Sequence, residues 1–137
     1  DSDEDISMII QNYRGSCLWT EENEQYAIDV LVGDENILKN SHYYHTKRTL
    51  KLVEINGVTK IARIRDNKIM ATKNKVISII ANAHRNAGYK GVKKTYNKVS
   101  EIYSNIPASL IYSYIKQCKC KSCKYRAEKR RLVRNVS

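Results

Sequence analysis

The stretch 115–124, IKQCKCKSCK, places Cys118, Cys120 and Cys123 within six residues of one another. His84 stands 34 residues before the first of them. Thiolates and a neutral imidazole are the ligands that zinc takes in closed tetrahedral sites, and such a site can organise a domain whose own apolar core is small. The fourth cysteine, Cys17, stands alone, so the pattern indicates a metal site in a reducing compartment rather than a disulfide framework.

Charge is distributed unevenly along the chain. Residues 1–40 contain ten acidic and two basic side chains, a net charge of −8, whereas residues 41–137 contain 23 Lys or Arg and four acids, a net charge of +19. The basic part has the composition of a protein that meets a polyanion, although a solubilising surface has the same composition. No apolar run approaches the roughly 18–20 residues of a membrane span, so no membrane partner is expected.

A helix is predicted near the start of the ordered part of the chain. Thr20 is a plausible N-cap, and the acidic residues that follow it favour the positive end of a helix dipole. Apolar residues then fall on one face until Gly33, which predicts a helix over 21–32. The end of this segment is rich in β-branched residues, so a strand over 26–32 is the competing interpretation.

The period of the apolar residues changes over 43–71, where a small antiparallel meander is predicted. Asn56-Gly57 lies between two β-branched runs, and this is the strongest short-range hairpin signal because both central residues of a type I′ turn need a positive φ. Asp66-Asn67 offers a second turn. A short third strand over 68–71 would follow it.

Three short helices are predicted after the meander. Amphipathic patterns cover about 73–86 and 91–103, and Pro107 lies near the first turn of a third helix. The fold class expected is therefore α+β, a small antiparallel β-meander followed by a three-helix, helix-turn-helix-like bundle. The apolar core of such a bundle is thin, and the His and Cys residues stand where a stabilising metal would be placed.

The motifs at these positions resemble a known family. The segments HRNAGYKGVKKT at 84–95 and IYSNI at 102–106, together with the cysteine cluster, resemble the N-terminal zinc-binding domain of retroviral and retrotransposon integrases. The string at 102–106 and LVEINGVTKI at 52–61 resemble most closely the version in integrase-like DNA transposases and their domesticated relatives. The resemblance covers about residues 45–126 and implies zinc as the cofactor.

The ligand set of that family is two histidines and two cysteines, and this sequence departs from it. His84 matches the first histidine, Tyr89 occupies the position of the second, and Cys118 matches the first cysteine. One extra cysteine then stands inside the cluster. We expect compensation, in which a metal is held by His84, Cys118, Cys120 and Cys123.

Three alternatives to this ligand set stay open. Tyr89 could have abolished zinc binding, because a neutral phenol is a poor ligand. A histidine of the pair His42 and His45, placed on a strand or loop, could reach the cluster. The cysteines could also be three reduced surface thiols in a basic tail.

The resemblance implies that the chain binds double-stranded DNA at transposon or viral ends and associates with itself. It also implies a nuclear location, or a virion nucleoprotein complex if the chain comes from a retroelement. Basic side chains on or near the second bundle helix and in the tail are the candidate phosphate contacts, with a solvated linker or a nuclear-import signal as the other interpretation of the tail. These candidates are Lys90, Lys93, Lys94, Lys98, Lys121, Lys124, Arg126, Lys129, Arg130 and Arg131.

No catalytic site is expected, because few carboxylates accompany the cluster and two-metal strand transfer needs three. No small-molecule substrate is expected either. The favoured function is a non-catalytic DNA-binding and assembly module, part of a longer integrase or integrase-derived transposase; the alternative is a domesticated protein–protein interaction module, and RNA binding is a weaker third. The expected organisation is an acidic segment that is a candidate for disorder (1–19), an extension subdomain (20–71), the zinc-binding helical domain (72–126) and a basic tail or linker (127–137).

Overall fold

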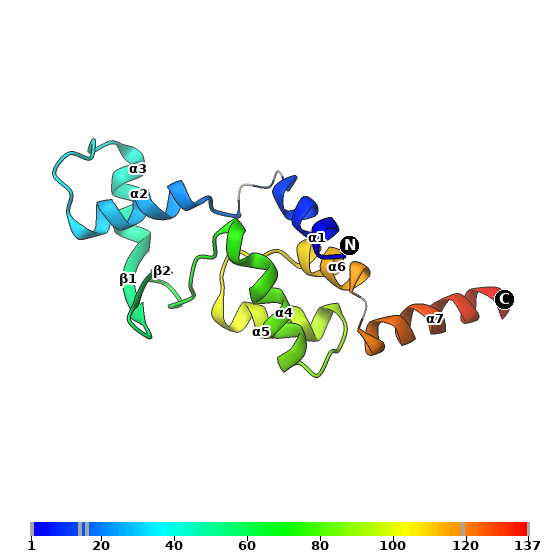
Figure 1. Ribbon diagram of the computed structural model, residues 1–137. Coiled ribbons are helices and arrows are strands. Elements are labelled where there is room, and N and C mark those ends of the chain that lie inside the picture. Colours follow the sequence, from blue (N-terminus) through cyan, green and yellow to red (C-terminus); the bar gives the residue numbers. More distant parts are fainter. Residues whose placement is uncertain (1, 14, 16, 119, 137) are drawn as a thin grey trace. The chain divides into compact units, whose positions relative to one another are not determined.

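The computed structural model describes residues 2–13, 15, 17–118 and 120–136, which form two compact units in an α+β fold (Figure 1). Unit 1 comprises the described residues of 1–14, 76–100 and 106–137, and unit 2 comprises those of 15–75 and 101–105. The described N-terminal residues therefore group with the helical bundle. Residues 101–105, expected in the bundle, group instead with the sheet.

Helix α2 (Glu21–Val32) begins unit 2, as predicted, and the strand alternative is wrong. A capping box starts the helix: the Thr20 hydroxyl accepts from the Asn23 backbone N–H, and the Asn23 side chain accepts from the Thr20 N–H. Gly33 ends the helix with a φ of 92°. These local caps outweigh the β propensity of the last turn, because they satisfy backbone groups that a strand would leave unpaired.

Helix α3 (Ser41–Thr49) contradicts the expected strand or loop around His42 and His45. The side chain of Asn40 caps this helix by accepting from the Tyr43 N–H. The hydroxyl of Thr46 is buried and donates to the His42 carbonyl within the helix. A good N-cap and a buried helical face thus override the β-favouring side chains of the segment.

The predicted hairpin is confirmed. Strands β1 (Leu50–Ile55) and β2 (Val58–Arg63) pair antiparallel, in a two-stranded sheet. Asn56 and Gly57 both have positive φ, 52° and 79°, as a type I′ turn requires.

The predicted third strand over 68–71 is reduced to an isolated bridge between Ile69 and Ala62. Instead of extending the sheet, Ile69 pairs in parallel with Tyr103: its N–H donates to the Ile102 carbonyl, and its own carbonyl accepts from Ser104. The backbone groups that would have built a meander are therefore used by residues 101–105.

Asn105 fastens this segment into unit 2. Its Oδ1 accepts from the Ala71 N–H at 2.7 Å, and its Nδ2 donates to the carbonyls of Ala71 at 2.8 Å and Cys17 at 2.9 Å. The side chain is 7% exposed. One buried amide thus joins three segments that are distant in the sequence.

Unit 1 contains the predicted helices at nearly the predicted positions and two helices that were not predicted. Helix α4 follows a short 3₁₀ turn (Lys73–Lys75), and α6 has Pro107 as its N-cap. Among the described residues no helix is long and apolar enough to cross a membrane. The helices are α1 (Ser2–Gln11), α4 (Val76–Asn86), α5 (Val92–Ile102), α6 (Ala108–Gln117) and α7 (Lys121–Val136).

The two unpredicted helices lie at the ends of the chain. Helix α1 forms where a disordered segment was expected, and α7 forms where a basic tail was expected. Helix α1 packs against α4 and α6, and its Ile10 is buried. Helix α7 starts inside the cysteine cluster and continues through the part of the tail that the structure describes. Neither was visible in the sequence, because α1 depends on tertiary packing and α7 has little apolar periodicity.

Replacing Asn105 by alanine should destabilise unit 2 by about 2–4 kcal/mol, because it removes three hydrogen bonds and leaves buried backbone groups unpaired. Urea unfolding followed by fluorescence of Trp19, the single tryptophan of the chain, would measure this change, since Trp19 packs against the core of unit 2. The exposed Asn36→Ala variant is the control and should unfold like the unmodified chain. Equal midpoints for the two variants would contradict the assigned role of Asn105.

Candidate metal centre

His84 is held in the last turn of α4, where the chain reverses direction. The helix ends at Asn86, Gly88 in the turn that follows has a φ of 71°, and the Tyr89 N–H donates to the His84 carbonyl at 2.8 Å. Tyr89 itself takes a φ of 59°, a left-handed conformation that is uncommon outside glycine and asparagine. The imidazole of His84 is 2% exposed, so this tight helix end places a nearly buried ring inside unit 1.

The cysteines stand on both sides of the break between α6 and α7. Cys118 is the C-cap of α6 and has an extended backbone. Cys120 precedes α7 and acts as its cap: its carbonyl accepts from the Lys124 N–H at 3.0 Å, and its sulfur accepts from the Cys123 N–H at 3.4 Å. Cys123 lies in the first turn and is 5% exposed. The C-x-x-C spacing thus combines helix capping with the presentation of two sulfur atoms.

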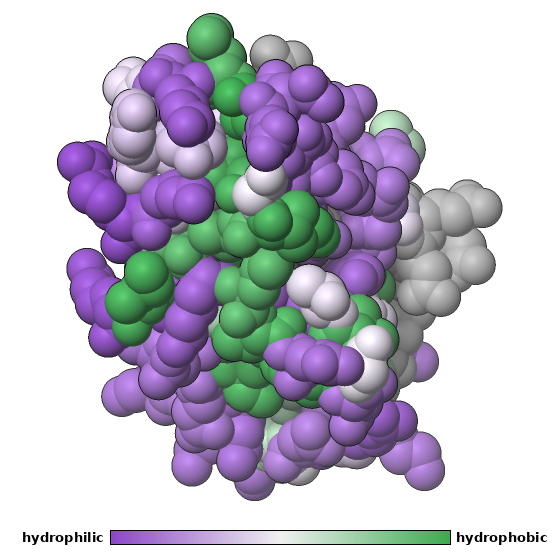
Figure 2. All heavy atoms as spheres, turned by 90° about the vertical axis from the view of Figure 1, so that its left-hand side faces the viewer, coloured by the Kyte–Doolittle hydropathy of each residue, from purple (hydrophilic) through white to green (hydrophobic). Residues whose placement is uncertain are grey.

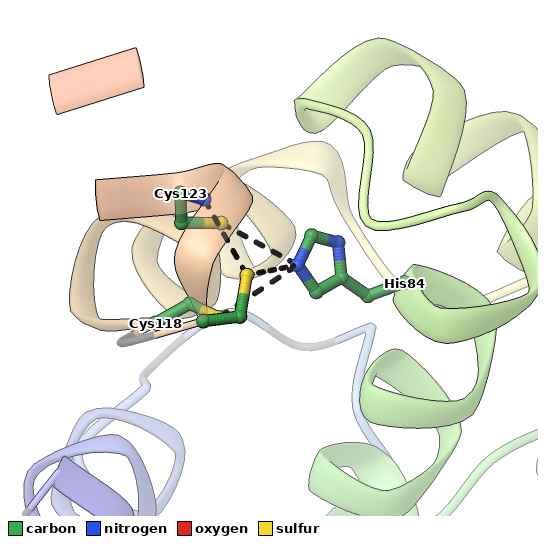
Figure 3. Close-up of side chains that lie close together, drawn as sticks. His84, Cys118 and Cys123 are labelled. Atoms are coloured by element: carbon green, nitrogen blue, oxygen red, sulfur yellow. Dashed lines mark hydrogen bonds between the residues drawn. The ribbon is translucent and has the colours of Figure 1, made fainter. Parts of the chain in front are cut away.

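The four side chains converge on one point. Nε2 of His84 lies 3.7 Å from the sulfur of Cys118, 3.5 Å from that of Cys120 and 3.4 Å from that of Cys123. Figure 3 shows the ring of His84 projecting from α4 toward the sulfur atoms of Cys118 and Cys123. All four ligand atoms lie within 4.8 Å of one another.

These distances fit a tetrahedral ion. With metal–sulfur bonds of about 2.3 Å and metal–nitrogen bonds of about 2.0–2.1 Å, a tetrahedron places nitrogen about 3.5–3.6 Å from each sulfur. The observed distances bracket that value. The four residues that the sequence predicted are therefore brought together in a group that can hold a metal ion.

A buried hydroxyl orients the imidazole. Nδ1 of His84 lies 3.4 Å from the Oγ1 of Thr95, and that hydroxyl donates to the Lys90 carbonyl at 3.4 Å. Since the hydroxyl hydrogen is used, its oxygen accepts from Nδ1–H, and the lone pair of Nε2 points at the sulfur atoms. Thr95 was not predicted as a site residue. A polar residue one turn before buried Val99, on an otherwise apolar helix face, was the available signal.

Arg126 joins the two halves of the site. Its Nη1 donates to the Tyr89 carbonyl at 3.0 Å, and its Nη2 donates to the sulfur of Cys123 at 3.1 Å. Arg126 was predicted as a phosphate contact, whereas its side chain is half-buried beside the candidate metal ligands. Its positive charge suits a site with several thiolates.

The side chain of Tyr89 is not part of the ligand group. Its ring meets that of His84 edge to face, with the centroids 5.4 Å apart, and is 42% exposed. His42 and His45 are not in the group either; they lie on α3 of unit 2, where His42 stacks on Tyr26. The group that can hold a metal ion therefore consists of His84 and the three cysteines, with Cys120 as the fourth potential ligand.

The protonation of the metal-free site follows from burial. Burial, assisted by the charge of Arg126, lowers the pKa of His84 and keeps its ring neutral. Burial and the neighbouring thiols raise the pKa of Cys123 to about 12, and burial also raises the pKa of Cys118. Burial opposes the thiolate of Cys120 too, but hydrogen bonds from the Cys123 N–H and the neighbouring thiols outweigh it and lower the pKa of Cys120.

The other basic candidates lie on exposed faces of unit 1. Lys90 precedes α5, three more lysines lie on α5, and the rest lie on α7. The structure also shows a groove of about 710 Å³ beside the metal centre. Lys116 and Gly91, which precedes α5, line this groove, and neither was predicted as a site residue. The cationic side chains that line it are Lys116, Lys124, Arg126, Arg130 and Arg131.

Metal binding should strengthen steeply as the pH rises. A bound metal needs thiolates, so the thiols of Cys118 and Cys123 must each lose a proton that they hold at neutral pH, while neutral His84 loses none. The logarithm of the apparent association constant should rise by about two per pH unit, and by about three below the pKa of Cys120. Competition with a chromophoric chelator between about pH 6 and 8 would measure this slope. A slope of one or less would contradict the three-thiolate site.

The Cys120→Ser variant should bind the metal at least about 100-fold more weakly, because a ligand matters more than the outer partners whose loss costs 10–100-fold. Native mass spectrometry and chelator competition would give the stoichiometry and the affinity. Cys17→Ser makes the same chemical change outside the cluster and should leave both unchanged. If Cys120→Ser held one metal with undiminished affinity, Cys120 would not be a ligand.

No family model, curated protein or solved structure matched the chain. Its function therefore has to follow from what the metal centre, the basic groove and the surfaces of the two units can do chemically.

Proposed function

We propose that the chain is a DNA-binding and assembly module of an integrase or integrase-derived transposase, with zinc as its structural metal. The observation that supports this most directly is the convergence of His84 with Cys118, Cys120 and Cys123. The integrase resemblance requires a histidine at the end of one bundle helix to lie close to cysteines that follow another bundle helix. These side chains lie close together here, although one histidine of the family's ligand set is absent.

Zinc is the metal that suits this donor set. Thiolates select soft or borderline metals, and a closed tetrahedron of three sulfurs and one nitrogen is a recognised structural zinc site. Magnesium and calcium prefer oxygen ligands. Three thiolates and a neutral imidazole leave zinc with a formal charge of −1, which Arg126 offsets through its contact with Cys123. Such a site contributes to folding and leaves no open position for a substrate.

The basic groove is the proposed contact with DNA. Its cationic side chains come from α6 and α7, and α5 begins at its edge, where the backbone N–H groups of a helix start attract phosphate. Contacts of this type position a protein on the duplex but do not read bases, so binding should be weakly selective for sequence. Because Cys120 caps α7 and Cys123 lies in its first turn, the metal would fix the direction in which this basic helix leaves the bundle.

The role is proposed as non-catalytic, with nuclear location and self-association on DNA following from the resemblance. Residues 41–137 contain four acids, spread between Glu54 and Glu128. The two-metal chemistry of strand transfer would need three carboxylates gathered at one site. Catalysis would then belong to another part of a longer protein.

A protein-interaction module is the second candidate, and the surface of unit 2 favours it. Figure 2, viewed from the side of Figure 1 where α2, α3 and the hairpin are drawn, shows a band of hydrophobic side chains bordered by hydrophilic ones. Exposed apolar area of this kind commonly marks a binding surface. The large hydrophobic residues of unit 2 with exposed side chains are Val32, Leu38, Tyr44, Ile55, Val58, Ile64 and Ile102.

Reversing the charges of Lys129, Arg130 and Arg131 to glutamate should abolish most duplex binding and make its salt dependence shallower. Each lost phosphate contact removes about 0.9 from the slope of log affinity against log salt, so a reduction of up to about three is expected. Fluorescence anisotropy with a labelled duplex at several salt concentrations would measure both quantities.

A matched control is the reversal of Lys39, Lys47 and Lys51 in unit 2, which changes the net charge equally and should leave the slope unchanged. If the α7 variant bound duplex DNA as tightly as the unmodified chain, with the same slope, the DNA-binding proposal would be removed and the protein-interaction candidate would stand.

A further inference from the structure

We propose that unit 2 contains a nucleotide-binding pocket, separate from the metal centre and from the basic groove. A cavity of about 670 Å³ is lined by residues of α2, α3, β1, the end of β2 and the segments around Trp19 and Met70. Its volume lies within the range of about 300–1,000 Å³ that is typical of small-ligand sites. This cavity was not predicted from the sequence, because its lining residues come from separate segments that only the fold brings together.

Aromatic rings form one part of the wall. Tyr26 of α2 and His42 of α3 are stacked, with ring centroids 4.6 Å apart and planes within 12°. Trp19, half-buried, and Met70 line the same cavity. The hydroxyl of Tyr26 is buried and has no hydrogen-bond partner in the described part of the chain. Buried polar atoms normally have a hydrogen-bond partner, so a ligand that reaches this hydroxyl would supply the partner that it lacks.

Cationic side chains form the other part. Arg48, Arg63 and Arg65 line the cavity, and none of its lining residues is acidic. The guanidinium of Arg63 is engaged by Asp66, whereas Arg48 and Arg65 are exposed and have no carboxylate partner among the described residues. Arginine binds phosphate through paired N–H groups, so these two side chains can hold an anion at the mouth of the cavity.

A nucleotide satisfies both parts of the wall at once. Its base is a flat ring that stacks on aromatic side chains, and its phosphate suits the two arginines. An apolar peptide would leave the arginines without an anionic partner. An acidic peptide would pair with the arginines, but its acidic side chains have no flat ring to stack on the aromatic part of the wall. The same chemistry belongs to a free mononucleotide and to one unit of a single-stranded polynucleotide. The pocket is independent of the proposed function, since no metal ligand or groove residue contributes to it.

Trp19 is the single tryptophan and lines the cavity, so its fluorescence reports on binding there. The metal-loaded full chain would be titrated with adenosine monophosphate, a short single-stranded oligodeoxyadenylate, adenosine, inorganic phosphate and a glutamate-rich peptide containing tyrosine. We expect saturable quenching by the mononucleotide or the oligonucleotide. Adenosine lacks the phosphate that the arginines would bind, and inorganic phosphate lacks the base that would stack on the rings. Each should therefore bind at least tenfold more weakly than the mononucleotide.

Three variants locate the site. Arg48→Ala combined with Arg65→Ala should weaken nucleotide binding at least tenfold, and Tyr26→Phe should weaken it severalfold. Lys47→Ala removes an exposed cation from the same helix but not from the cavity, so it should bind like the unmodified chain. Circular dichroism checks that each variant is folded. The exposed arginines can be replaced without disturbing the core.

The outcomes divide clearly. Equal affinity for the mononucleotide and the oligonucleotide would identify a free nucleotide as the ligand, whereas saturation by the oligonucleotide alone would identify a strand. The proposal is overturned if no nucleotide quenches Trp19 saturably, if the double arginine variant binds normally, or if the acidic peptide binds more tightly than either nucleotide probe.

Discussion

The meeting of one imidazole nitrogen with three sulfur atoms is the constraint on which unit 1 depends. The ligands come from the end of α4, the end of α6 and the start of α7, so one ion would fix three helix termini at once. Helices of 10 or 11 residues are marginal by themselves, and most of their stability must come from tertiary contacts. A metal that binds only the folded arrangement adds its binding free energy to folding.

Tyr89 and Cys120 have separate structural tasks beside His84. The backbone of Tyr89 turns the chain after α4, and its carbonyl accepts from Arg126. Cys120 offers a ligand atom to the group and also caps α7 through its sulfur. Because the capping N–H favours negative charge on that sulfur, the helix start and the ligand stabilise each other.

The sequence predicted secondary structure correctly where that structure depends on interactions between residues close together in the chain. Thr20, Gly33 and the Asn56-Gly57 pair predicted a helix and a hairpin correctly, because caps and turns act over a few residues. The ligand group spans the 34 residues from His84 to Cys118, and it was predicted because cysteine and histidine are the residue types that zinc selects and because the predicted helices between them can bring their ends together. The third strand was wrong because the partner of Ile69 is Tyr103, 34 residues away, and no local pattern records such a pairing.

Chain connectivity links the two units energetically although their sites are separate. Residues 101–105 follow the body of α5 directly, and Asn105 among them makes three hydrogen bonds of unit 2. Helix α5 is in turn tied to the metal centre through Thr95 and His84. A metal that orders α5 reduces the conformational freedom that residues 101–105 lose when they pair with Ile69 and Ala71. A bound metal would therefore stabilise unit 2 as well, although none of its ligands would belong to that unit.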